Sequence, residues 1–419
     1  MTDTTWFTDA RFGLFVHWGL HSLAARHEWV QKHEAIPTEE YGRYLEYFDP
    51  DLFDPVAWAE TAWQAGMRYT VITTKHHEGF CLWDSDLTDF KATSAPASRD
   101  LLAEFTDAFR ARGFKIGFYY SLIDWRHPEF PVDQYHPHSE DELAKAEPRD
   151  MGKYVEYMNG QVTELLTRYG QIDIIWFDYS YNRPGVWGGK GPDDWESENL
   201  LKLARDLQPG ILVNNRLGIP GDFATPEQFQ PSNPPTQDGE PIVWEACHTL
   251  NGSWGYDRDN HRFKSPDLLA RMLIDSVAKN GNVLLNVGPN GRGELEPTAV
   301  ERLSALAGWM RLHERSIRGA GASDFQAPTD MRFTQRGNRL YLHLYTWPLK
   351  HVHLQDMAGK VAYAQFLHDA SEVGLKWHGG AVHSQLEDSS ITEDTLTLIV
   401  PEQKPDVLVP VIELFLEEA

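Results

Sequence analysis

Cysteine is scarce in this chain of 419 residues, and its scarcity excludes two kinds of site. The two cysteines, Cys81 and Cys247, lie far apart and form no CxxC pair. They cannot supply the disulfide framework of a small secreted domain or the paired thiolates of a cysteine-rich zinc site. A functional site in this protein must therefore be built mainly from other side chains.

Positive charge is also in short supply. Lys and Arg number 38 against 62 Asp and Glu, which gives a formal net charge of −24. Nucleic acids and anionic lipid surfaces are bound by clustered cations. The charge balance therefore argues against both as partners.

Long apolar runs are absent as well. No stretch approaches the ~18 apolar residues that a membrane helix requires. The residues Met1–Phe7 contain neither the basic segment nor the apolar run of a signal peptide. We therefore expect a cytoplasmic protein without a membrane segment.

Short apolar runs alternate with longer helical patterns through the first three quarters of the chain. We expect strands at 11–18, 69–77, 115–122, 172–179, 211–215, 242–247 and 283–287, and helices at 55–65, 100–113, 151–169, 195–207, 266–279 and 297–312. Asp54, Asp100 and Ser265 precede three of these helices as N-caps. Several strands are too apolar to have a solvated face, which is typical of a parallel sheet covered by helices. At about 310 residues, this α/β pattern favours a (β/α)8-like barrel over a doubly wound sheet.

The periodicity changes beyond residue 318. Residues 331–345 alternate with period two around Gly337-Asn338, which indicates a hairpin. Further strand-like runs follow at 360–367, 395–400 and 407–416 with no helix between them. We therefore expect a barrel domain at 1–320 and a C-terminal all-β sandwich at 328–419. Three long irregular loops, 124–148, 182–194 and 217–240, would lie over the active face of the barrel.

Titratable and aromatic residues gather where the predicted barrel strands end. The ends read His17-Trp18, Lys75-His76-His77-Glu78, Tyr119-Tyr120-Ser121, Trp176-Phe177-Asp178, Asn214-Asn215-Arg216 and Trp244-Glu245. Catalytic groups of a barrel enzyme project from the carboxyl ends of its strands. A barrel with a purely structural role has no reason to collect histidines and carboxylates on one rim, so the pattern predicts an active site there.

The residue types on this rim suit a sugar. Aromatic rings are abundant in the chain, with 15 Trp, 16 Tyr and 20 Phe, and they offer flat surfaces to the C–H groups of a sugar ring. A retaining glycosidase needs two carboxyl groups about 5–5.5 Å apart, one ionised as the nucleophile and one protonated as the acid. Asp178 ends an apolar strand and is our candidate nucleophile. Four residues remain as candidates for the acid: Glu227, Glu245, Glu78 and Glu28.

Five segments carry a family resemblance. They are FGLFVHWG at 12–19, KHHEGFCLW at 75–83, GFYYS at 117–121, WFD at 176–178 and NVGPN at 286–290. In this order they resemble the motifs of the family 29 α-L-fucosidases, over roughly residues 6–320. The resemblance implies a (β/α) barrel, a C-terminal β-sandwich and a retaining exo-acting mechanism without a metal or another cofactor.

The resemblance also implies roles for single residues. Asp178 falls on the nucleophile, and Glu227, in the segment GDFATPEQ at 221–228, resembles the acid/base, with Glu245 in reserve. Trp254 matches an aromatic wall against the methyl group of fucose. The other positions matching residues that contact or surround the sugar are His17, Glu28, Trp29, His76, His77, Tyr119, Trp176 and Arg216. The expected partner is a fucosylated oligosaccharide, and the sequence leaves both the linkage and the oligomeric state open.

Two alternatives belong to other functional classes. His17, His76 and His77 with a carboxylate could instead be ligands of a metal-dependent barrel hydrolase. However, adjacent histidines on a strand point to opposite faces, so His76 and His77 would share a site only if the chain bends there. The third possibility is a catalytically silent sugar-binding protein, against which the intact Asp178 counts.

Overall fold

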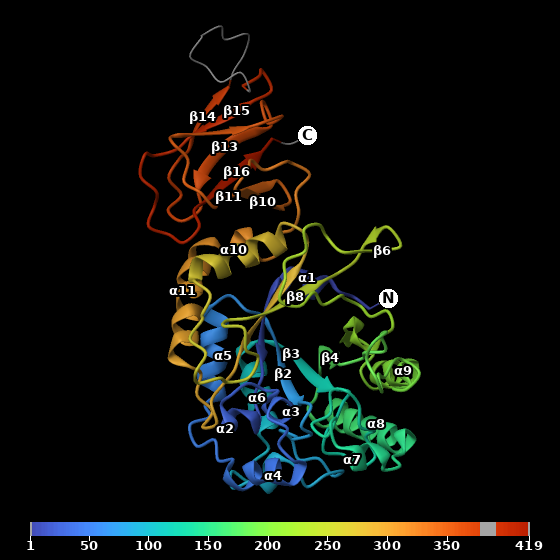
Figure 1. The fold of residues 1–419 in the computed structure, drawn as a ribbon. Helices are drawn as coiled ribbons and strands as arrows, with labels where there is room; N and C mark the ends of the chain where they lie inside the picture. Colours follow the sequence, from blue (N-terminus) through green and yellow to red (C-terminus); the bar gives the residue numbers. More distant parts are fainter. Residues whose placement is uncertain (1, 378–390, 418–419) are drawn as a thin grey trace.

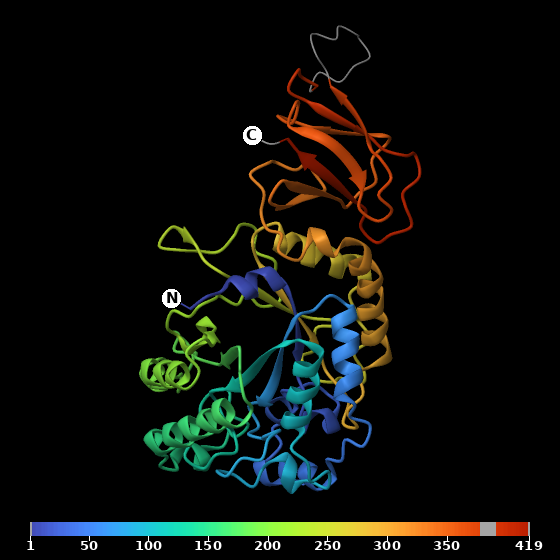
Figure 2. The ribbon, with the colours of Figure 1, turned by 180° about the vertical axis from the view of Figure 1, so that it is seen from behind.

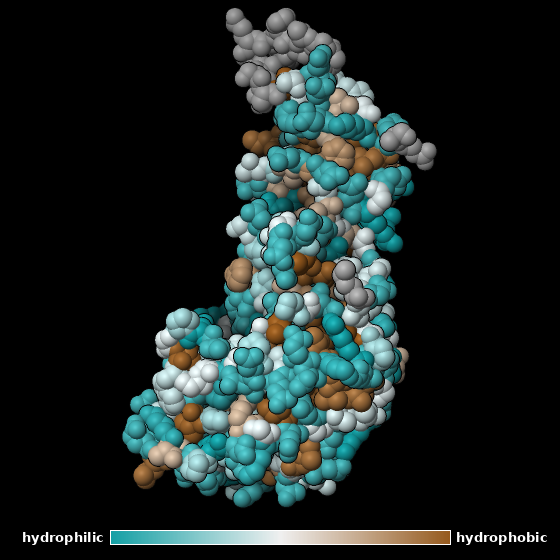
Figure 3. Space-filling model, turned by 90° about the vertical axis from the view of Figure 1, so that its right-hand side faces the viewer, coloured by the Kyte–Doolittle hydropathy of each residue, from teal (hydrophilic) through white to brown (hydrophobic). Residues whose placement is uncertain are grey.

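The computed structural model describes residues 2–377 and 391–417. Figure 1 shows a larger α/β part at the amino-terminal end and a smaller all-β part stacked on it beyond helix α10. Among the described residues, no helix is long and apolar enough to cross a membrane. One face of the molecule is predominantly hydrophilic, with apolar residues scattered over it (Figure 3).

A curled sheet of parallel strands forms the centre of the larger part. Within the described residues it has seven strands in the order β5-β4-β3-β2-β1-β9-β8. Their residues are buried almost throughout, as expected for apolar strands with helices on the outside and side chains filling the inside. The strands are β1 Phe12–Val16, β2 Tyr69–Lys75, β3 Lys115–Ser121, β4 Ile174–Asp178, β5 Leu212–Val213, β8 Glu245–Thr249 and β9 Asn282–Val287.

Helices pack around the outside of this sheet (Figures 1 and 2). The three predicted N-caps are confirmed, since Asp54, Asp100 and Ser265 each accept a hydrogen bond from a backbone N–H in the first turn of their helix. The long helices are α5 Pro55–Gln64, α6 Leu101–Arg112, α8 Met151–Arg168, α9 Ser197–Leu207, α10 Pro266–Val277 and α11 Pro297–His313. Shorter helices are α1 Thr5–Ala10, α2 His21–Ala24, α3 Val30–His33, α4 Thr38–Gly42 and α7 Glu142–Ala146.

An irregular segment fills the gap between the two end strands of the sheet. Asn214, just after β5, bridges Phe223 in parallel, while Ala224 and Glu227 bridge Trp244 and Cys247 next to and within β8. Residues 223–227 therefore take the place of an eighth strand between β5 and β8. This corrects the expectation that 217–240 is wholly an irregular rim loop, because part of it is hydrogen bonded to both end strands. A small hairpin follows, β6 Thr236–Gln237 and β7 Glu240–Pro241.

The smaller part consists of two antiparallel sheets. One has the order β10-β11-β16-β13 and the other β12-β15-β14, and apolar side chains from both share a core. The predicted hairpin at Gly337 is confirmed, while β12 and β14 were not predicted. The strands are β10 Met331–Arg336, β11 Arg339–Leu344, β12 His351–Leu354, β13 Val361–Phe366, β14 Gly374–Trp377, β15 Leu396–Ile399 and β16 Val411–Leu416. Residues 378–390 and 418–419 of the expected sandwich lie outside the described residues.

The two parts meet through polar and apolar contacts at α10 and α11. The Trp309 indole N–H donates to the Val409 carbonyl oxygen at 2.8 Å, and Arg332 pairs with Asp275 at 2.8 Å. Val409 and Tyr341 belong to the same apolar cluster as the helices of the larger part. The β-sheets thus pack on the barrel through α10 and α11, and none of their residues lines the pocket described below.

Candidate active site

A pocket of about 170 Å³ opens at the carboxyl ends of the barrel strands. Every sequence-predicted site residue except Glu245 and Glu78 lines it, together with Phe15, Tyr179 and Cys247, which the sequence reasoning missed. The lining residues are Phe15, His17, Glu28, Trp29, His76, His77, Tyr119, Trp176, Asp178, Tyr179, Arg216, Glu227, Cys247 and Trp254.

Asp178 is held at the end of β4 by two donors. The Tyr119 hydroxyl donates to Asp178 Oδ2 at 2.8 Å, and Arg216 Nη1 contacts Asp178 Oδ1 at 2.9 Å. Burial, followed by the charge of Asp178, raises the pKa of Tyr119 well above its ordinary value, so the phenol keeps its proton and remains a donor. Both donors fix the position of the Asp178 carboxyl group at the rim of the barrel.

Arg216 also contacts Glu227, so one guanidinium joins the two carboxylates. Arg216 lies just after β5, and its Nη2 is 2.8 Å from Glu227 Oε2. Burial opposes the charge of Arg216, but Asp178 and Glu227 nevertheless keep its pKa above the ordinary value. The Asp178 side chain is 13% exposed and that of Glu227 is 41% exposed. Glu227 therefore lies nearer the mouth, where a leaving group would depart, while Asp178 lies deeper.

Three histidines line the pocket from the ends of β1 and β2. His17 Nδ1 is 2.6 Å from Asn286 Oδ1, and His77 Nδ1 is 2.8 Å from Ser121 Oγ. Burial, followed by the neighbouring His76, lowers the pKa of His17 and of His77 well below the ordinary value. Both rings are therefore neutral near pH 7 and can accept a hydrogen bond from a hydroxyl.

The chain bends where β2 ends, as the sequence analysis required for His76 and His77 to share a site. The pairing of β2 with β3 changes register between Thr73 and Lys75, and the strand stops there. The rings of His76 and His77 then lie with their centroids only 3.9 Å apart. Both face the same pocket as a result.

Aromatic rings and one carboxylate complete the walls. The Trp254 ring lies 5.1 Å from that of His17, and the Trp29 ring lies 5.0 Å from that of His77. Glu28 Oε2 accepts the backbone N–H of Gly255 at 2.8 Å, while its buried Oε1 lies 3.3 Å from His27 Nε2. A pocket with apolar rings and several neutral or anionic acceptors matches a sugar, which offers both C–H faces and O–H donors.

Glu245 lies outside the pocket, and its predicted position at the carboxyl end of a strand is wrong. It is the first residue of β8, so it lies at the opposite end of the strand from the pocket and is fully buried in the barrel. Its carboxyl accepts the Tyr69 hydroxyl at 2.5 Å and the Trp176 indole N–H at 3.2 Å. Burial raises its pKa to about 7, although both hydrogen bonds act in the opposite direction. Glu245 cannot reach a leaving group from there.

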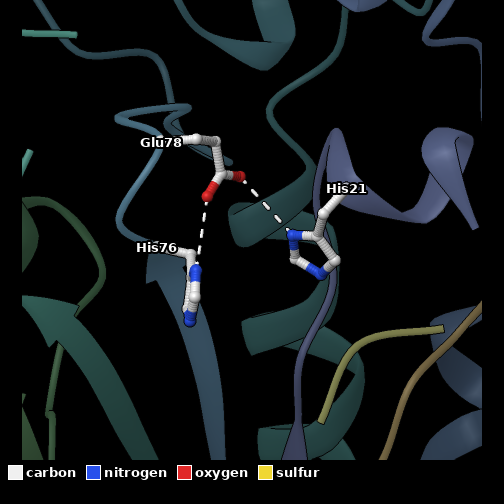
Figure 4. A group of neighbouring side chains, drawn as sticks. All are labelled: His21, His76 and Glu78. Atoms are coloured by element: carbon white, nitrogen blue, oxygen red, sulfur yellow. Dashed lines mark hydrogen bonds and ion pairs between the residues drawn. The ribbon is translucent and has the colours of Figure 1, made fainter. Parts of the chain in front are cut away.

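The residues that could hold a metal ion in the structure differ from the set His17, His76 and His77 that the sequence suggested. His17 and His77 use their Nδ1 atoms on Asn286 and Ser121. Among the described residues, the three side chains close enough to hold an ion are His21, His76 and Glu78, whose ligand atoms lie within 4.8 Å of one another. Figure 4 shows the Glu78 carboxylate between the two imidazoles, with one oxygen toward each ring.

Comparisons with known proteins agree with this site. The sequence profile described as Alpha-L-fucosidase matches residues 2–315. Alpha-L-fucosidase isoenzyme 1 from Paenibacillus thiaminolyticus is 45% identical with a TM-score of 0.93, covering 99% of each chain. A GH29 alpha-L-fucosidase from Bacteroides thetaiotaomicron is 25% identical with a TM-score of 0.85, covering 99% of this chain and 94% of that one. Tissue alpha-L-fucosidase from Bos taurus is 29% identical over 373 residues, 82% of this chain and 75% of that protein. This chain belongs to the α-L-fucosidase family, glycoside hydrolase family 29.

Proposed function

We propose that this protein is a retaining exo-α-L-fucosidase that removes terminal α-L-fucosyl residues from oligosaccharides by double displacement. The observation that carries the proposal is the bridge from Arg216 to both Asp178 and Glu227 in a pocket of single-sugar dimensions. Both carboxylates contact the same guanidinium, which is compatible with the separation of about 5–5.5 Å used by retaining enzymes.

Asp178 and Glu227 divide the reaction between them. An oxygen of Asp178 attacks the anomeric carbon and forms the fucosyl–enzyme ester, while Glu227 in its acid form gives its proton to the departing glycosidic oxygen. Glu227, now a carboxylate, takes a proton from a water molecule, whose oxygen attacks the anomeric carbon and releases Asp178 and fucose. The deeper position of Asp178 and the more exposed position of Glu227 suit these two roles.

Sugar selection follows from the walls of the pocket. His17, His77 and Glu28 offer acceptors to ring hydroxyls, and a substrate without one of those hydroxyls would leave a buried polar group unpaired. Trp254 offers an apolar surface for the methyl group that distinguishes fucose from L-galactose. We therefore expect a weaker α-L-galactosidase activity at the same site.

The test is hydrolysis of 4-nitrophenyl α-L-fucoside by the wild type and by Asp178→Ala. We expect kcat to fall at least about 1000-fold in the variant, with an unchanged circular dichroism spectrum, because the nucleophile is lost. Azide should then restore turnover and yield β-fucosyl azide, whereas the wild type should release α-fucose first. A folded Asp178→Ala protein with near wild-type kcat would refute the assignment.

A matched variant separates the two carboxylates. Glu227→Gln should slow cleavage of natural linkages much more than cleavage of nitrophenyl fucoside, since nitrophenolate leaves without a proton. Glu245→Gln should affect both substrates equally and only weakly, because Glu245 lies outside the pocket. If Glu245→Gln instead showed the leaving-group dependence, the acid would have to be reassigned.

A further inference from the structure

A buried chain of three side chains ends at the pocket. His76 lines the pocket, and its Nδ1 lies 3.3 Å from Glu78 Oε2. The other oxygen of Glu78, Oε1, lies 3.5 Å from His21 Nδ1. All three side chains are at most 4% exposed. In Figure 4 the second ring nitrogen of His76 points away from Glu78.

Local geometry holds this chain in place. Gly79, directly after Glu78, has a φ of +85° and its N–H donates to the His76 carbonyl oxygen at 3.1 Å, which forms a tight turn around the carboxylate. A Cβ on Gly255 would lie 2.6 Å from His21 Cδ2, so the backbone beside Trp254 packs directly on the His21 ring. These contacts restrict the movement of both the Glu78 carboxylate and the His21 ring.

The hydrogen bonds of His17 and His77 show which ring nitrogen carries the proton in the other two pocket histidines. Asn286 Nδ2 donates to the Trp254 carbonyl, so the Asn286 oxygen is the atom that faces His17 Nδ1 and can only accept. The Ser121 hydroxyl donates to the Ile123 carbonyl at 2.7 Å, so it accepts from His77 Nδ1. Both rings therefore carry their proton on Nδ1 and leave Nε2 as an acceptor.

The Glu78 carboxylate next to His76 Nδ1 favours the tautomer with the proton on Nδ1, and it does so more strongly than Asn286 does for His17 or Ser121 for His77. An ionised carboxyl has no proton to donate, so at 3.3 Å it favours a ring proton on the nearer nitrogen, Nδ1. Burial alone would raise the pKa of Glu78, but hydrogen bonds from His21 and His76 lower it to about 2. Glu78 is therefore charged near pH 7, and a charged group attracts the ring proton more strongly than an amide or a hydroxyl does.

We propose that Glu78, held by His21, is a positioning residue that fixes the tautomer and orientation of His76, so that His76 Nε2 accepts a hydrogen bond from one ring hydroxyl of the sugar. The inference deepens the proposed function and depends on it. With His17 and His77 in the same tautomer, the pocket presents three imidazole acceptors to the hydroxyl donors of one sugar. Glu78 and His21 themselves do not touch the substrate.

The experiment measures kcat/KM for an aryl α-L-fucoside and its 2-, 3- and 4-deoxy analogues with the wild type, Glu78→Gln, Glu78→Asp and His21→Gln. A glutamine has one acceptor and one donor group, so it cannot accept from both imidazoles. We expect Glu78→Gln to lower kcat/KM for the parent fucoside about 10- to 100-fold. The loss should nearly vanish for the one analogue that lacks the hydroxyl bound by His76. Glu78→Asp, which keeps the carboxylate, should recover part of the activity, and His21→Gln should show a smaller loss of the same kind.

Glu164→Gln is the matched control. Glu164 is also a buried carboxylate, held by the Trp83 indole N–H, the Asp86 backbone N–H and the Arg168 guanidinium, but it lies on α8 outside the pocket. It should change the parent and all deoxy analogues by one common factor, as any loss of general packing would. If Glu78→Gln behaves in this way, or leaves the parent rate unchanged, the positioning role is refuted.

Two further outcomes keep the inferences separate. A wild type that hydrolyses no fucoside refutes the proposed function, and calorimetric binding of L-fucose and its deoxy analogues to the same variants then tests the positioning role directly. Stoichiometric zinc in the purified wild type that disappears in His21→Gln would refute the hydrogen-bonded chain, because the three side chains would then be metal ligands.

Discussion

The raised pKa of Glu245 in the folded protein leads us to expect that stability falls as the pH rises. Its carboxyl is fully buried in the barrel, and its pKa in the folded protein is about 7, against an ordinary value of 4.5. Below pH 4.5 both the folded and the unfolded chain hold this proton. Between pH 4.5 and 7 the unfolded chain releases it while the folded chain keeps it, so the free energy of unfolding falls as the pH rises through this window and levels off above it.

The magnitude follows from the two pKa values. Their difference of about 2.5 corresponds to about 3 kcal/mol, at about 1.4 kcal/mol for each tenfold change in the equilibrium. Glutamine does not titrate, so Glu245→Gln should lack this contribution. The free energy of unfolding of the variant relative to that of the wild type should therefore rise by about 3 kcal/mol between pH 4.5 and pH 8.

The assay is urea unfolding of both proteins across this pH range, followed by tryptophan fluorescence. Taking the difference between the two proteins cancels the titration of the other acidic residues. Tyr69→Phe adds a directional check, because it removes a hydrogen bond that lowers the pKa of Glu245, so the window should move to higher pH. A relative stability that stays constant within about 0.5 kcal/mol from pH 4.5 to pH 8 would refute the reasoning.

Three further substitutions test other contacts. Arg216→Lys should lower kcat/KM for an aryl fucoside about 100-fold, since an ammonium group cannot serve both carboxylates as a guanidinium does, and a loss below about threefold would count against the bridge. Asp133→Asn should leave the buried Lys190 ammonium unpaired, lower stability by about 3–5 kcal/mol and speed proteolysis within residues 182–194, and unchanged melting and digestion would contradict this. Gly255→Ala should raise KM more than it lowers kcat, because the new methyl group meets the His21 ring beside the pocket, and steady-state kinetics with unchanged KM would argue against a tight fit.

Local sequence signals predicted most of the regular structure. The side chains of Asp54, Asp100 and Ser265 cap their helices as expected, because capping involves residues only three positions apart. The apolar runs gave the strands of the curled sheet, since a parallel strand buried on both faces needs no partner in the sequence to be recognised. The place of Asp178 at the end of β4 follows from the same pattern.

Contacts between distant segments escaped prediction. Residues 223–227 carry no strand periodicity and become part of the barrel only because they exchange backbone hydrogen bonds with residues at the open edges of the sheet, next to β5 and along β8. The strand predicted at 242–247 begins at Glu245 instead, which puts that carboxylate at the opposite end of the barrel from the pocket. Because the strand starts three residues later than predicted, Glu245 is a buried carboxyl group inside the barrel and not a catalytic acid in the pocket.

By itself, the sequence determined the α/β pattern, the rim on which polar residues gather, and the family motifs that point to a fucosidase. Each of these is written in residues close together along the chain. Only the tertiary structure decided that Arg216 joins Asp178 to Glu227 and that Glu78 joins His21 to His76. These partners lie 11 to 57 positions apart, except for His76 and Glu78, and closing the barrel is what brings such groups close together.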